Sequence, residues 1–369
     1  MAKKIIIAGG GTGGHIFPAI AIANAIKREQ PDCDILFIGA KGKMEMERVP
    51  QAGYEIRGID IAGFNRSSLL KNVGLPLKLV KSFFQVRNLF INYMPDAVIG
   101  VGGYSTFPVL RYAQSKGIPT FIHEANSFAG KSNKLLGKNA KRIFVATDGM
   151  EQFFPESKIT ISGNPVRESI VNTTITRDSG VRYFNLDPAK KVVLIVGGSL
   201  GARSINEAIH AAIEKFEGAG VQLIWQTGKL YKELAIEALK GSRGMYTNDF
   251  ISSMENAYAA ADVVVSRAGA MSIAELAVVR KPVIFVPYPF AAEDHQTVNA
   301  SKLVDKGAGL MVKDSEAKTE LVDTVIDLLN NESKQEEMKR NIGAMAISNA
   351  DEIVAAEVLR IIDLDGAIA

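Results

Sequence analysis

The chain has 369 residues, more than one hydrophobic core usually holds, so two domains are expected. Apolar residues make up 47% and charged residues 22%, as in soluble globular proteins, and the net charge of +3 is too small to indicate a nucleic-acid-binding protein. The single cysteine, Cys33, excludes an internal disulfide framework and is typical of a reducing compartment. The uncharged segment Ile5–Ile26 contains five glycines, so it predicts neither a signal peptide nor a membrane-spanning helix. We therefore expect a cytosolic or peripheral protein.

The first half of the chain alternates short apolar strands with amphipathic helices. Lys3–Ala8 is a predicted strand, followed by the loop GGGTGGH and a helix over about residues 17–28. Further strands are predicted at Asp34–Ile38, Asp96–Val101 and Pro119–His123. This alternation predicts an α/β fold with a parallel sheet and helices on both faces.

The pattern begins again in the second half. The sequence KKIIIAGGGTGGHIFPAIAIANAI at residues 3–26 is echoed by KKVVLIVGGSLGARSINEAIHAAI at residues 190–213. A repeat that occurs twice, half the chain apart, indicates a duplicated domain and not a solenoid. We predict two Rossmann-like domains facing a cleft, at residues 1–164 and 165–349, divided near Gly163-Asn164-Pro165. A final helix over about residues 350–369 could pack on either domain.

Three glycine-rich loops follow predicted strands, at Gly9–Gly14, Gly102-Gly103 and Gly197–Gly201. Glycine lets a backbone approach a ligand closely, and the amides at the start of the following helix form an anion site. The first loop also satisfies the dinucleotide-binding spacing GxGxxG, which expects an acid at the end of the second strand. That acid is missing, because Asp34 lies at the other end of the strand. A dinucleotide-dependent oxidoreductase is therefore the alternative prediction.

The segment from Ser266 to Asn299 carries polar side chains after two predicted strands. Glu275 lies three residues after Ser272, a capping-box spacing, and Gln296 and Asn299 share one face of the next helix. A carboxylate and two amides at one edge of a parallel sheet suit a diol and a sugar. The alternative is that Glu275 is only a helix cap and that the amides lie on a solvated face.

Three of the four histidines follow predicted strands. His15 and His123 end loops of the first half, His295 lies in a strand–helix turn of the second, and His210 lies inside a predicted helix. The first three are candidates for an acid–base or sugar-binding role. No group has the spacing of metal ligands, and Asp32-Cys33-Asp34 precedes its strand, so we interpret it as a turn.

The segment from Ile61 to Pro95 contains no Asp or Glu and combines many Leu and Phe residues with five basic ones. The basic residues are Arg66, Lys71, Lys78, Lys81 and Arg87. Apolar groups with only basic partners are typical of a segment that binds an anionic membrane surface. The alternative is an amphipathic helix packed on the sheet with solvated lysines.

Six motifs together resemble the MurG family over almost the whole chain. In chain order they are GGGTGGHIFPA, GGY, HEAN, GNPVR, GGSLGARSIN and SRAGAMSIAEL…DHQTVNA. Members of that family are GT-B-fold, inverting glycosyltransferases of peptidoglycan synthesis, which move N-acetylglucosamine from UDP-N-acetylglucosamine to the muramyl sugar of lipid I (undecaprenyl-pyrophosphoryl-MurNAc-pentapeptide). The resemblance implies a peripheral protein at the cytoplasmic face of the cell membrane, without a metal ion or other cofactor. One departure is Phe107, which stands where members often carry a small residue.

The resemblance also implies roles for individual residues. For the general base of this reaction we predict His15, because it titrates near neutral pH and lies at the tip of the first glycine loop. Glu124 is the rival candidate, and the alternative is that His15 only orients the substrate. The donor diphosphate would contact Ser199, the Gly197-Gly198 amides and Arg167, and uracil would pair with the Ile251 backbone. The nucleoside would be held by Ala270, Met271, Ser272, Ile273, Ala274 and Glu275, with Glu275 on the ribose. The sugar would contact Gln296, Asn299 and Asn126, and Thr12, Gly13 and Gly14 would close over the donor. A non-catalytic nucleotide-binding or scaffold protein would need neither His15 nor Gln296.

Overall fold

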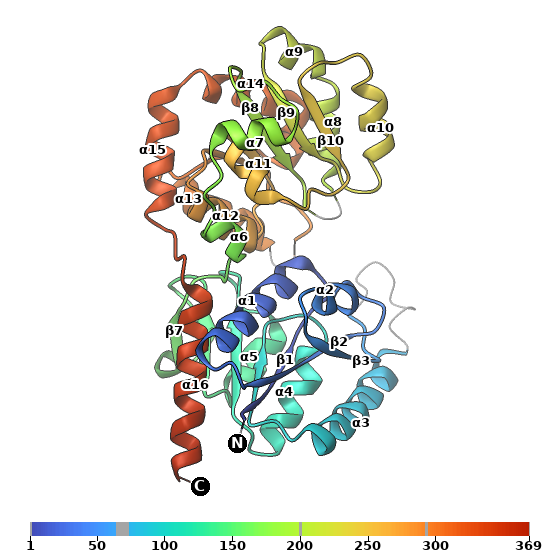
Figure 1. Ribbon diagram of the computed structural model, residues 1–369, viewed down its shortest axis with the longest axis vertical. Coiled ribbons are helices and arrows are strands. Elements are labelled where there is room, and N and C mark those ends of the chain that lie inside the picture. The colour runs from blue at the N-terminus through green and yellow to red at the C-terminus, as the bar shows by residue number, and fades with distance from the viewer. Residues whose placement is uncertain (1, 64–73, 199–200, 292–293, 369) are drawn as a thin grey trace. The chain divides into compact units, whose positions relative to one another are not determined.

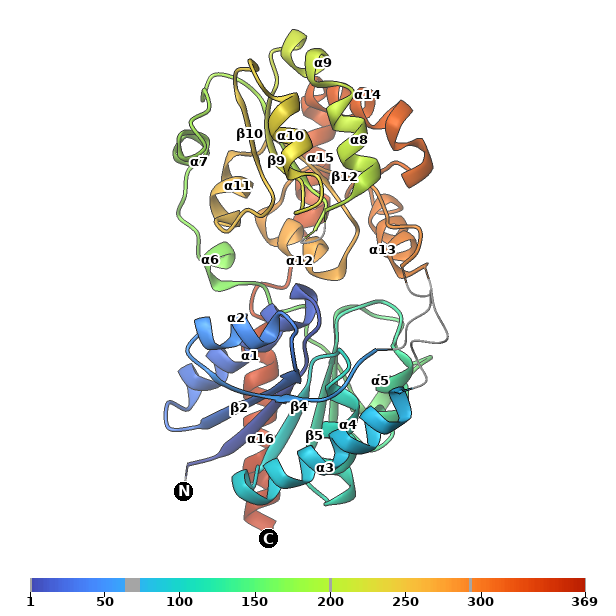
Figure 2. The same ribbon diagram turned by 90° about the vertical axis from the view of Figure 1, so that its right-hand side faces the viewer.

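The computed structural model describes residues 2–63, 74–198, 201–291 and 294–368 (Figures 1 and 2). The chain forms two compact units, one of Met1–Arg167 with Asn349–Ala369 and the other of Glu168–Ser348. The chain thus passes from the first unit to the second three residues after the predicted division between residues 164 and 165. The first unit is discontinuous in sequence because the end of the chain returns to it.

The first unit contains a seven-stranded parallel sheet with the order β3-β2-β1-β4-β5-β6-β7. The strands are β1 (Lys4–Ala8), β2 (Asp34–Ala40), β3 (Glu55–Ile59), β4 (Ala97–Gly100), β5 (Thr120–Glu124), β6 (Arg142–Val145) and β7 (Ile159–Ile161). The strand order changes direction between β1 and β4, and such a switch point leaves a crevice at the carboxyl ends of the strands. Both β1 and β4 end in a glycine-rich loop there.

Helices cover both faces of this sheet. They are α1 (Gly13–Glu29), α2 (Glu45–Gln51), α3 (Leu75–Tyr93), α4 (Thr106–Ser115), α5 (Lys131–Gly137) and α16 (Ala350–Ile368). Successive side chains of a strand point to opposite faces, so Ile5 and Ile7 pack with α1 and α16, whereas Ile6 and Ala8 pack with α3 and α4 (Figure 2). The apolar part of the predicted strand, Ile5–Ala8, is therefore buried on both sides.

The C-terminal helix α16 lies along α1 in the first unit (Figure 1). Its residues Val354, Ala355 and Val358 are fully buried in the same core as α1. Arg28 of α1 also donates to Asp351 at 2.8 Å. The sequence left the partner of this helix open, and its apolar face against α1 explains why the chain end returns to the first unit.

The second unit contains a six-stranded parallel sheet with the order β10-β9-β8-β11-β12-β13. Its strands are β8 (Val192–Val196), β9 (Gln222–Gln226), β10 (Met245–Asn248), β11 (Val263–Ser266), β12 (Val283–Phe285) and β13 (Leu310–Met311). Its helices are α6 (Glu168–Val171), α7 (Arg177–Tyr183), α8 (Arg203–His210), α9 (Ile213–Gly218), α10 (Lys232–Ala238), α11 (Met254–Ala260), α12 (Ala270–Val279), α13 (His295–Val304), α14 (Ala317–Leu329) and α15 (Glu332–Gly343). Strand β8 takes the place here that β1 takes in the first sheet, as the sequence repeat predicts.

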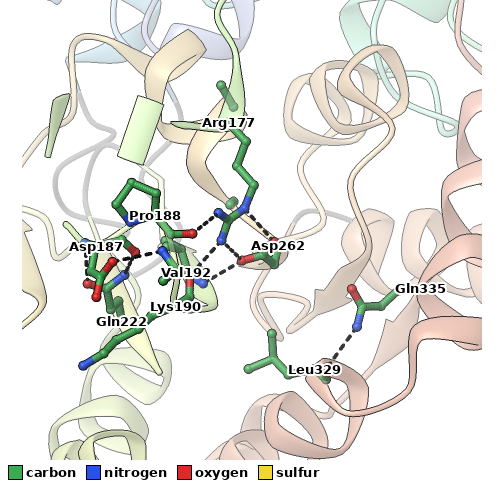
Figure 3. A network of polar contacts seen from close by, with 12 residues as sticks. Arg177, Asp187, Pro188, Lys190, Val192, Gln222, Asp262, Leu329 and Gln335 are labelled. Atoms are coloured by element: carbon green, nitrogen blue, oxygen red, sulfur yellow. Dashed lines mark hydrogen bonds and ion pairs between the residues drawn. The ribbon is translucent and has the colours of Figure 1, made fainter. Parts of the chain in front are cut away.

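A network of polar contacts joins the amino ends of three strands in this unit (Figure 3). Arg177 of α7 donates to both carboxylate oxygens of Asp262, at 3.0 and 2.8 Å, and this pairing raises the pKa of the guanidinium. The same carboxylate accepts from the Val192 amide at the start of β8, at 2.8 Å. Ligands of parallel sheets bind at the carboxyl ends, so these contacts stabilise the fold at the edge away from the candidate site.

Candidate functional site

The first two glycine loops pack against each other at the ends of β1 and β4. The Gly10 amide donates to the Gly102 carbonyl at 3.2 Å. Gly103 has a φ of +90°, and a Cβ there would lie 2.2 Å from the Gly10 carbonyl oxygen. Any larger residue at Gly103 would therefore push the two loops apart, which is the physical reason for glycine at this position.

His15 lies in the first turn of α1, because this helix begins at Gly13 and not near residue 17 as predicted. The prediction that His15 lies at the tip of a loop is therefore wrong. Its Nδ1 lies 3.1 Å from the Gly10 carbonyl and 3.5 Å from the Thr12 hydroxyl. A carbonyl only accepts, so Nδ1 carries the hydrogen and Nε2 carries the lone pair. A Cβ on Gly102 would lie 2.7 Å from Nε2, so the ring rests directly on the second loop.

Burial lowers the pKa of His15, while the Gly10 carbonyl and the charges of Glu124 and Glu45 oppose the shift. The net direction is toward the neutral imidazole at physiological pH. A neutral ring with its lone pair on Nε2 is the form that removes a proton from a hydroxyl group. His15 therefore combines the tautomer and the charge state that a general base requires.

Glu124, the rival candidate for the base, is a buried carboxylate that accepts four hydrogen bonds. Oε1 accepts from the amide and the side chain of Asn126, at 3.2 and 3.3 Å. Oε2 accepts from the Gly130 amide at 3.1 Å and from Asn133 Nδ2 at 2.9 Å. This carboxylate orders the loop that carries Asn126, because its two oxygens accept from that loop and from α5. Asn133 was not predicted from the sequence.

His123 is also buried, at the end of β5, and its Nε2 lies 3.1 Å from the Gly163 carbonyl. Burial lowers the pKa of this imidazole to about 4, so it is neutral at physiological pH. His123 links the sheet to the segment that leads out of the first unit, which indicates a structural role. The other two histidines are at helix ends: His295 is the first residue of α13, and His210 lies beside the Tyr231 hydroxyl at 3.1 Å.

Glu45, the first residue of α2, is a buried carboxylate that the sequence analysis missed. Its Oε2 accepts from the Gly11 amide at 2.8 Å, and its Oε1 accepts from the Ala40 amide at 3.0 Å. The acid sought at the end of the second strand is thus present five residues later. It holds the glycine loop itself and so is not free to bind the ribose of a dinucleotide. The sequence signal that could have identified Glu45 is an acidic residue in the first turn of the helix that follows the second strand.

Glu275 lies on α12, which begins at Ala270 after the N-cap residue Gly269. Ser272 is the third residue of the helix and not its cap, so the capping-box interpretation of Glu275 is wrong. The Glu275 side chain is instead buried, and its Oε2 accepts from the Tyr258 hydroxyl of α11 at 2.9 Å. The nucleoside candidates Ala270–Glu275 therefore form the first turns of one helix, with the buried carboxylate held by Tyr258.

The two predicted amides on α13 connect neighbouring loops. Gln296 Oε1 accepts from the Tyr288 amide after β12 at 2.9 Å, and Asn299 Nδ2 donates to the Ala268 carbonyl after β11 at 3.2 Å. Asn299 is buried and Gln296 is partly buried, so the alternative of a solvated face is wrong for Asn299. Both residues lie at the same edge of the sheet as Glu275.

The candidate contacts to uracil and the diphosphate lie on the other side of β11, after β8 and β10. The Ile251 amide donates to Gln226 Oε1 at 2.9 Å, so only the Ile251 carbonyl remains for the expected backbone pairing with uracil. Gln226 Nε2 in turn donates to the Gly198 carbonyl at 3.2 Å. Ser199, which was predicted to contact the diphosphate, lies outside the described residues.

Arg167 and Arg267 belong to different units. Arg167, predicted to add positive charge at the diphosphate, belongs to the first unit, where its guanidinium lies 5.1 Å from the Phe17 ring of α1. Arg267 of the second unit was not predicted. It donates to the Val286 carbonyl at 2.8 Å and to Asp314 at 2.5 Å, and so ties the loops after β11 and β12 together.

Among the residues that the structure describes, no group of three or more His, Cys, Asp or Glu could hold a metal ion.

The chain is similar to known proteins over almost its whole length. Residues 5–145 match the glycosyltransferase family 28 N-terminal domain, and residues 192–354 match the C-terminal domain of that family. A crystal structure of MurG from Acinetobacter baumannii is similar with a TM-score of 0.76 and 30% identity, covering 97% of this chain and 99% of that one. The chain belongs to the MurG family of glycosyltransferases.

Two relatives have closer sequences. A protein of Phocaeicola vulgatus is 50% identical over 363 residues, covering 98% of this chain and 96% of its own length. A protein of Bacteroides fragilis is 49% identical over 364 residues, with the same coverage. Both are named UDP-N-acetylglucosamine–N-acetylmuramyl-(pentapeptide) pyrophosphoryl-undecaprenol N-acetylglucosamine transferase. The predictions of the family, of a GT-B-type fold with two parallel-sheet α/β domains, and of a glycosyltransferase are confirmed.

Proposed function

We propose that this chain performs the transfer for which its relatives are named, by a single inverting displacement. It is an N-acetylglucosamine transferase that uses UDP-N-acetylglucosamine and lipid I and forms lipid II in peptidoglycan synthesis. The observation that carries this conclusion is 50% identity over 98% of the chain to a relative of that name. The proposal extends to the roles of individual residues and to the membrane, as follows.

The donor would bind at the carboxyl edge of the second sheet. Glu275 is suited to the two ribose hydroxyls, because its buried carboxylate is already oriented by Tyr258. The Ile251 carbonyl would accept from uracil N3–H, and the amides of the Gly197-Gly198 loop and Ser199 would contact the diphosphate. Gln296 and Asn299 would contact the sugar. From the first unit, Asn126 would reach the sugar, Arg167 the diphosphate, and Thr12, Gly13 and Gly14 would close over the donor.

His15 would remove the proton from the 4-hydroxyl of the muramyl sugar as its oxygen attacks the anomeric carbon. The C–O bond to UDP breaks on the opposite face, and the α-linked donor becomes a β-linked product, by the geometry of inverting glycosidases. The departing diphosphate gains negative charge, which backbone amides and a helix N-terminus stabilise. The neutral His15 ring, with its lone pair on Nε2, supports this role.

Binding to an anionic membrane surface is supported by one face of α3. The exposed side chains of Leu77, Val80, Phe84 and Ile91 are 79%, 57%, 63% and 55% accessible, and their spacing puts them on one side of the helix. The opposite side, with Val86 and Phe90, is buried on the sheet. The alternative, an amphipathic helix packed on the sheet, explains the buried side but not the exposed apolar side chains. Apolar residues exposed on one face are what an interfacial helix inserts between lipid headgroups.

The basic residues around this face support the same proposal in part. Lys78 and Arg87 are exposed, whereas Lys81 pairs with Asp60 at 2.9 Å, and this pairing weakens its attraction to lipid. Arg66 and Lys71 lie outside the described residues. The described helices include none with the length and apolar composition of a membrane span. We place the enzyme peripherally on the cytoplasmic face, where the lipid-linked acceptor would be reached.

Phe107, the departure from the family pattern, packs its ring against Phe83 of α3, with the ring centroids 6.5 Å apart. This contact gives the larger side chain a structural role between α3 and α4. Because Phe107 packs on a neighbouring helix, its larger size does not change the acceptor that we propose, lipid I.

The test of the proposed function is a reconstituted transfer assay with radiolabelled UDP-N-acetylglucosamine and lipid I in detergent. Label should enter the lipid product, and UDP release should require both substrates. UDP release without the acceptor would indicate a hydrolase. Thermal stabilisation by UDP without any transfer would indicate a non-catalytic nucleotide-binding protein, and stabilisation by NAD instead of UDP would indicate the oxidoreductase alternative.

A further inference from the structure

Gln226 is the last residue of β9 and has a side chain that is only 3% exposed. Both ends of its amide are bonded to the backbone of other segments. Nε2 donates to the Gly198 carbonyl at 3.2 Å, and Oε1 accepts from the Ile251 amide at 2.9 Å. A buried amide costs free energy unless it is hydrogen-bonded, so these two contacts specify where both backbone segments lie.

The two segments lie on opposite sides of β9. Gly198 belongs to the loop after β8, and Ile251 follows β10, while the sheet order places β9 between these two strands. Gly198 also has a φ of +85°, a conformation that favours glycine, so any other residue at this position would strain the loop. One side chain thus spans three neighbouring strand ends at the ligand-binding edge of the sheet.

We propose that Gln226 is a positioning residue that holds the diphosphate loop and the uracil-binding segment of the donor site in a fixed relative position. The inference rests on the proposed function, because that function assigns Gly197-Gly198 to the diphosphate and Ile251 to uracil. Both ends of the Gln226 amide are used by backbone groups, so its proposed effect on the ligand is exerted through them. Its amide fixes the distance between two groups that must meet one ligand at the same time, so it preorganises the site.

The same strand offers a matched control. Gln222, the first residue of β9, is also 3% exposed, and its amide makes two backbone hydrogen bonds with Asp187, both at 2.8 Å. These contacts lie at the amino end of the sheet, beside the Arg177–Asp262 network (Figure 3). Removing the amide of either buried glutamine therefore removes two hydrogen bonds to the backbone, at opposite ends of β9.

The experiment compares Gln226→Leu, Gln222→Leu and wild type by thermal unfolding and by titration calorimetry with UDP-N-acetylglucosamine, UDP and uridine. Both variants should unfold at a lower temperature than wild type, because each leaves backbone groups without partners. Only Gln226→Leu should raise the Kd of UDP, by about tenfold, the factor that corresponds to losing one typical hydrogen bond. Gln222→Leu should bind all three ligands like wild type.

Gln226→Glu separates the two contacts of the amide. An ionised Glu at this position keeps an oxygen acceptor for the Ile251 amide but has no hydrogen to donate to the Gly198 carbonyl. Uridine binding should therefore remain close to wild type in Gln226→Glu, whereas UDP binding should weaken. In Gln226→Leu both should weaken. This split between nucleoside and diphosphate affinity is a result that a general loss of stability does not produce.

Two outcomes would overturn the inference. One is unchanged UDP and uridine affinity in Gln226→Leu with folding retained, and the other is an equal loss of affinity in Gln226→Leu and Gln222→Leu. In either case transfer by the wild-type enzyme would leave the proposed function intact. Absence of UDP binding and transfer in the wild-type enzyme would instead refute the proposed function, so the two failures are distinguishable.

Discussion

Replacement of Glu275 by alanine tests the donor site directly. The Glu275 side chain is 7% exposed, and its Oε2 accepts from the Tyr258 hydroxyl at 2.9 Å. In the proposed donor site this carboxylate is the group that would accept from the ribose hydroxyls. Glu275→Ala removes the contact with Tyr258 and the proposed contact with the ribose. The first loss should lower stability and the second should weaken donor binding, so the two effects are measured separately.

The expected magnitudes follow from the two contacts. Leaving the Tyr258 hydroxyl without its acceptor should lower the free energy of unfolding by about 1–3 kcal/mol. Losing charged hydrogen bonds to the ribose should weaken UDP-N-acetylglucosamine binding by about 1–3 kcal/mol, which is about 5- to 150-fold in Kd. Tyr258→Phe is the control, because it removes the buried hydroxyl and leaves the carboxylate. It should lower stability with a smaller change in donor affinity.

The assay is calorimetric titration with UDP and with 2′-deoxy-UDP, alongside denaturant unfolding. Wild type should prefer UDP, because the 2′-hydroxyl donates to the carboxylate, and this preference should shrink in Glu275→Ala. If the ratio of the two Kd values were the same in wild type and Glu275→Ala, the carboxylate would not contact the ribose. The assignment of Glu275 to the donor would then be refuted, whatever happened to stability.

His15→Ala should lower turnover about 100-fold with donor affinity largely kept, and near-normal turnover in steady-state kinetics would remove His15 from the role of base. Since burial lowers the pKa of His15 from its usual 6.5, the wild-type pH–rate profile should fall only below that pH, and this acidic limb should vanish in the variant. The pKa of His123 is about 4, so stability should fall as pH drops from 6.5 toward 4, by up to about 3 kcal/mol. Denaturant unfolding of wild type and His123→Gln at pH 7 and 5 measures this, and equal pH slopes would contradict it. Phe84→Glu and Leu77→Glu should reduce sedimentation with phosphatidylglycerol vesicles, whereas Leu230→Glu, at a 94% exposed leucine of the other unit, should not. Equal loss in all three variants would argue against α3 as the binding face.

Local patterns were sufficient for the architecture. The apolar run Ile5–Ile7 within the predicted strand Lys3–Ala8 indicated a buried strand, because parallel strands covered on both faces need no polar alternation. The repeat at residues 3–26 and 190–213 predicted two similar domains. The first strand of each copy, β1 or β8, lies inside its sheet at the point where the strand order changes direction. Local spacing failed where tertiary contacts decided the outcome. Ser272 and Glu275 have the spacing of a capping box, yet α12 begins earlier and Tyr258 takes the carboxylate.

The sequence by itself determined the fold class and the family and supplied the candidates for the site, because these depend on periodicity and on motifs of neighbouring residues. Only the tertiary structure revealed the side chains that hold the site in place. Glu45 reaches a loop 34 residues earlier, and Gln226 reaches backbone groups 28 residues before it and 25 after it. Such contacts form when strand ends meet at one edge of a parallel sheet. No local pattern encodes them, because any buried acid or amide there needs a partner and only the folded chain decides which one it finds.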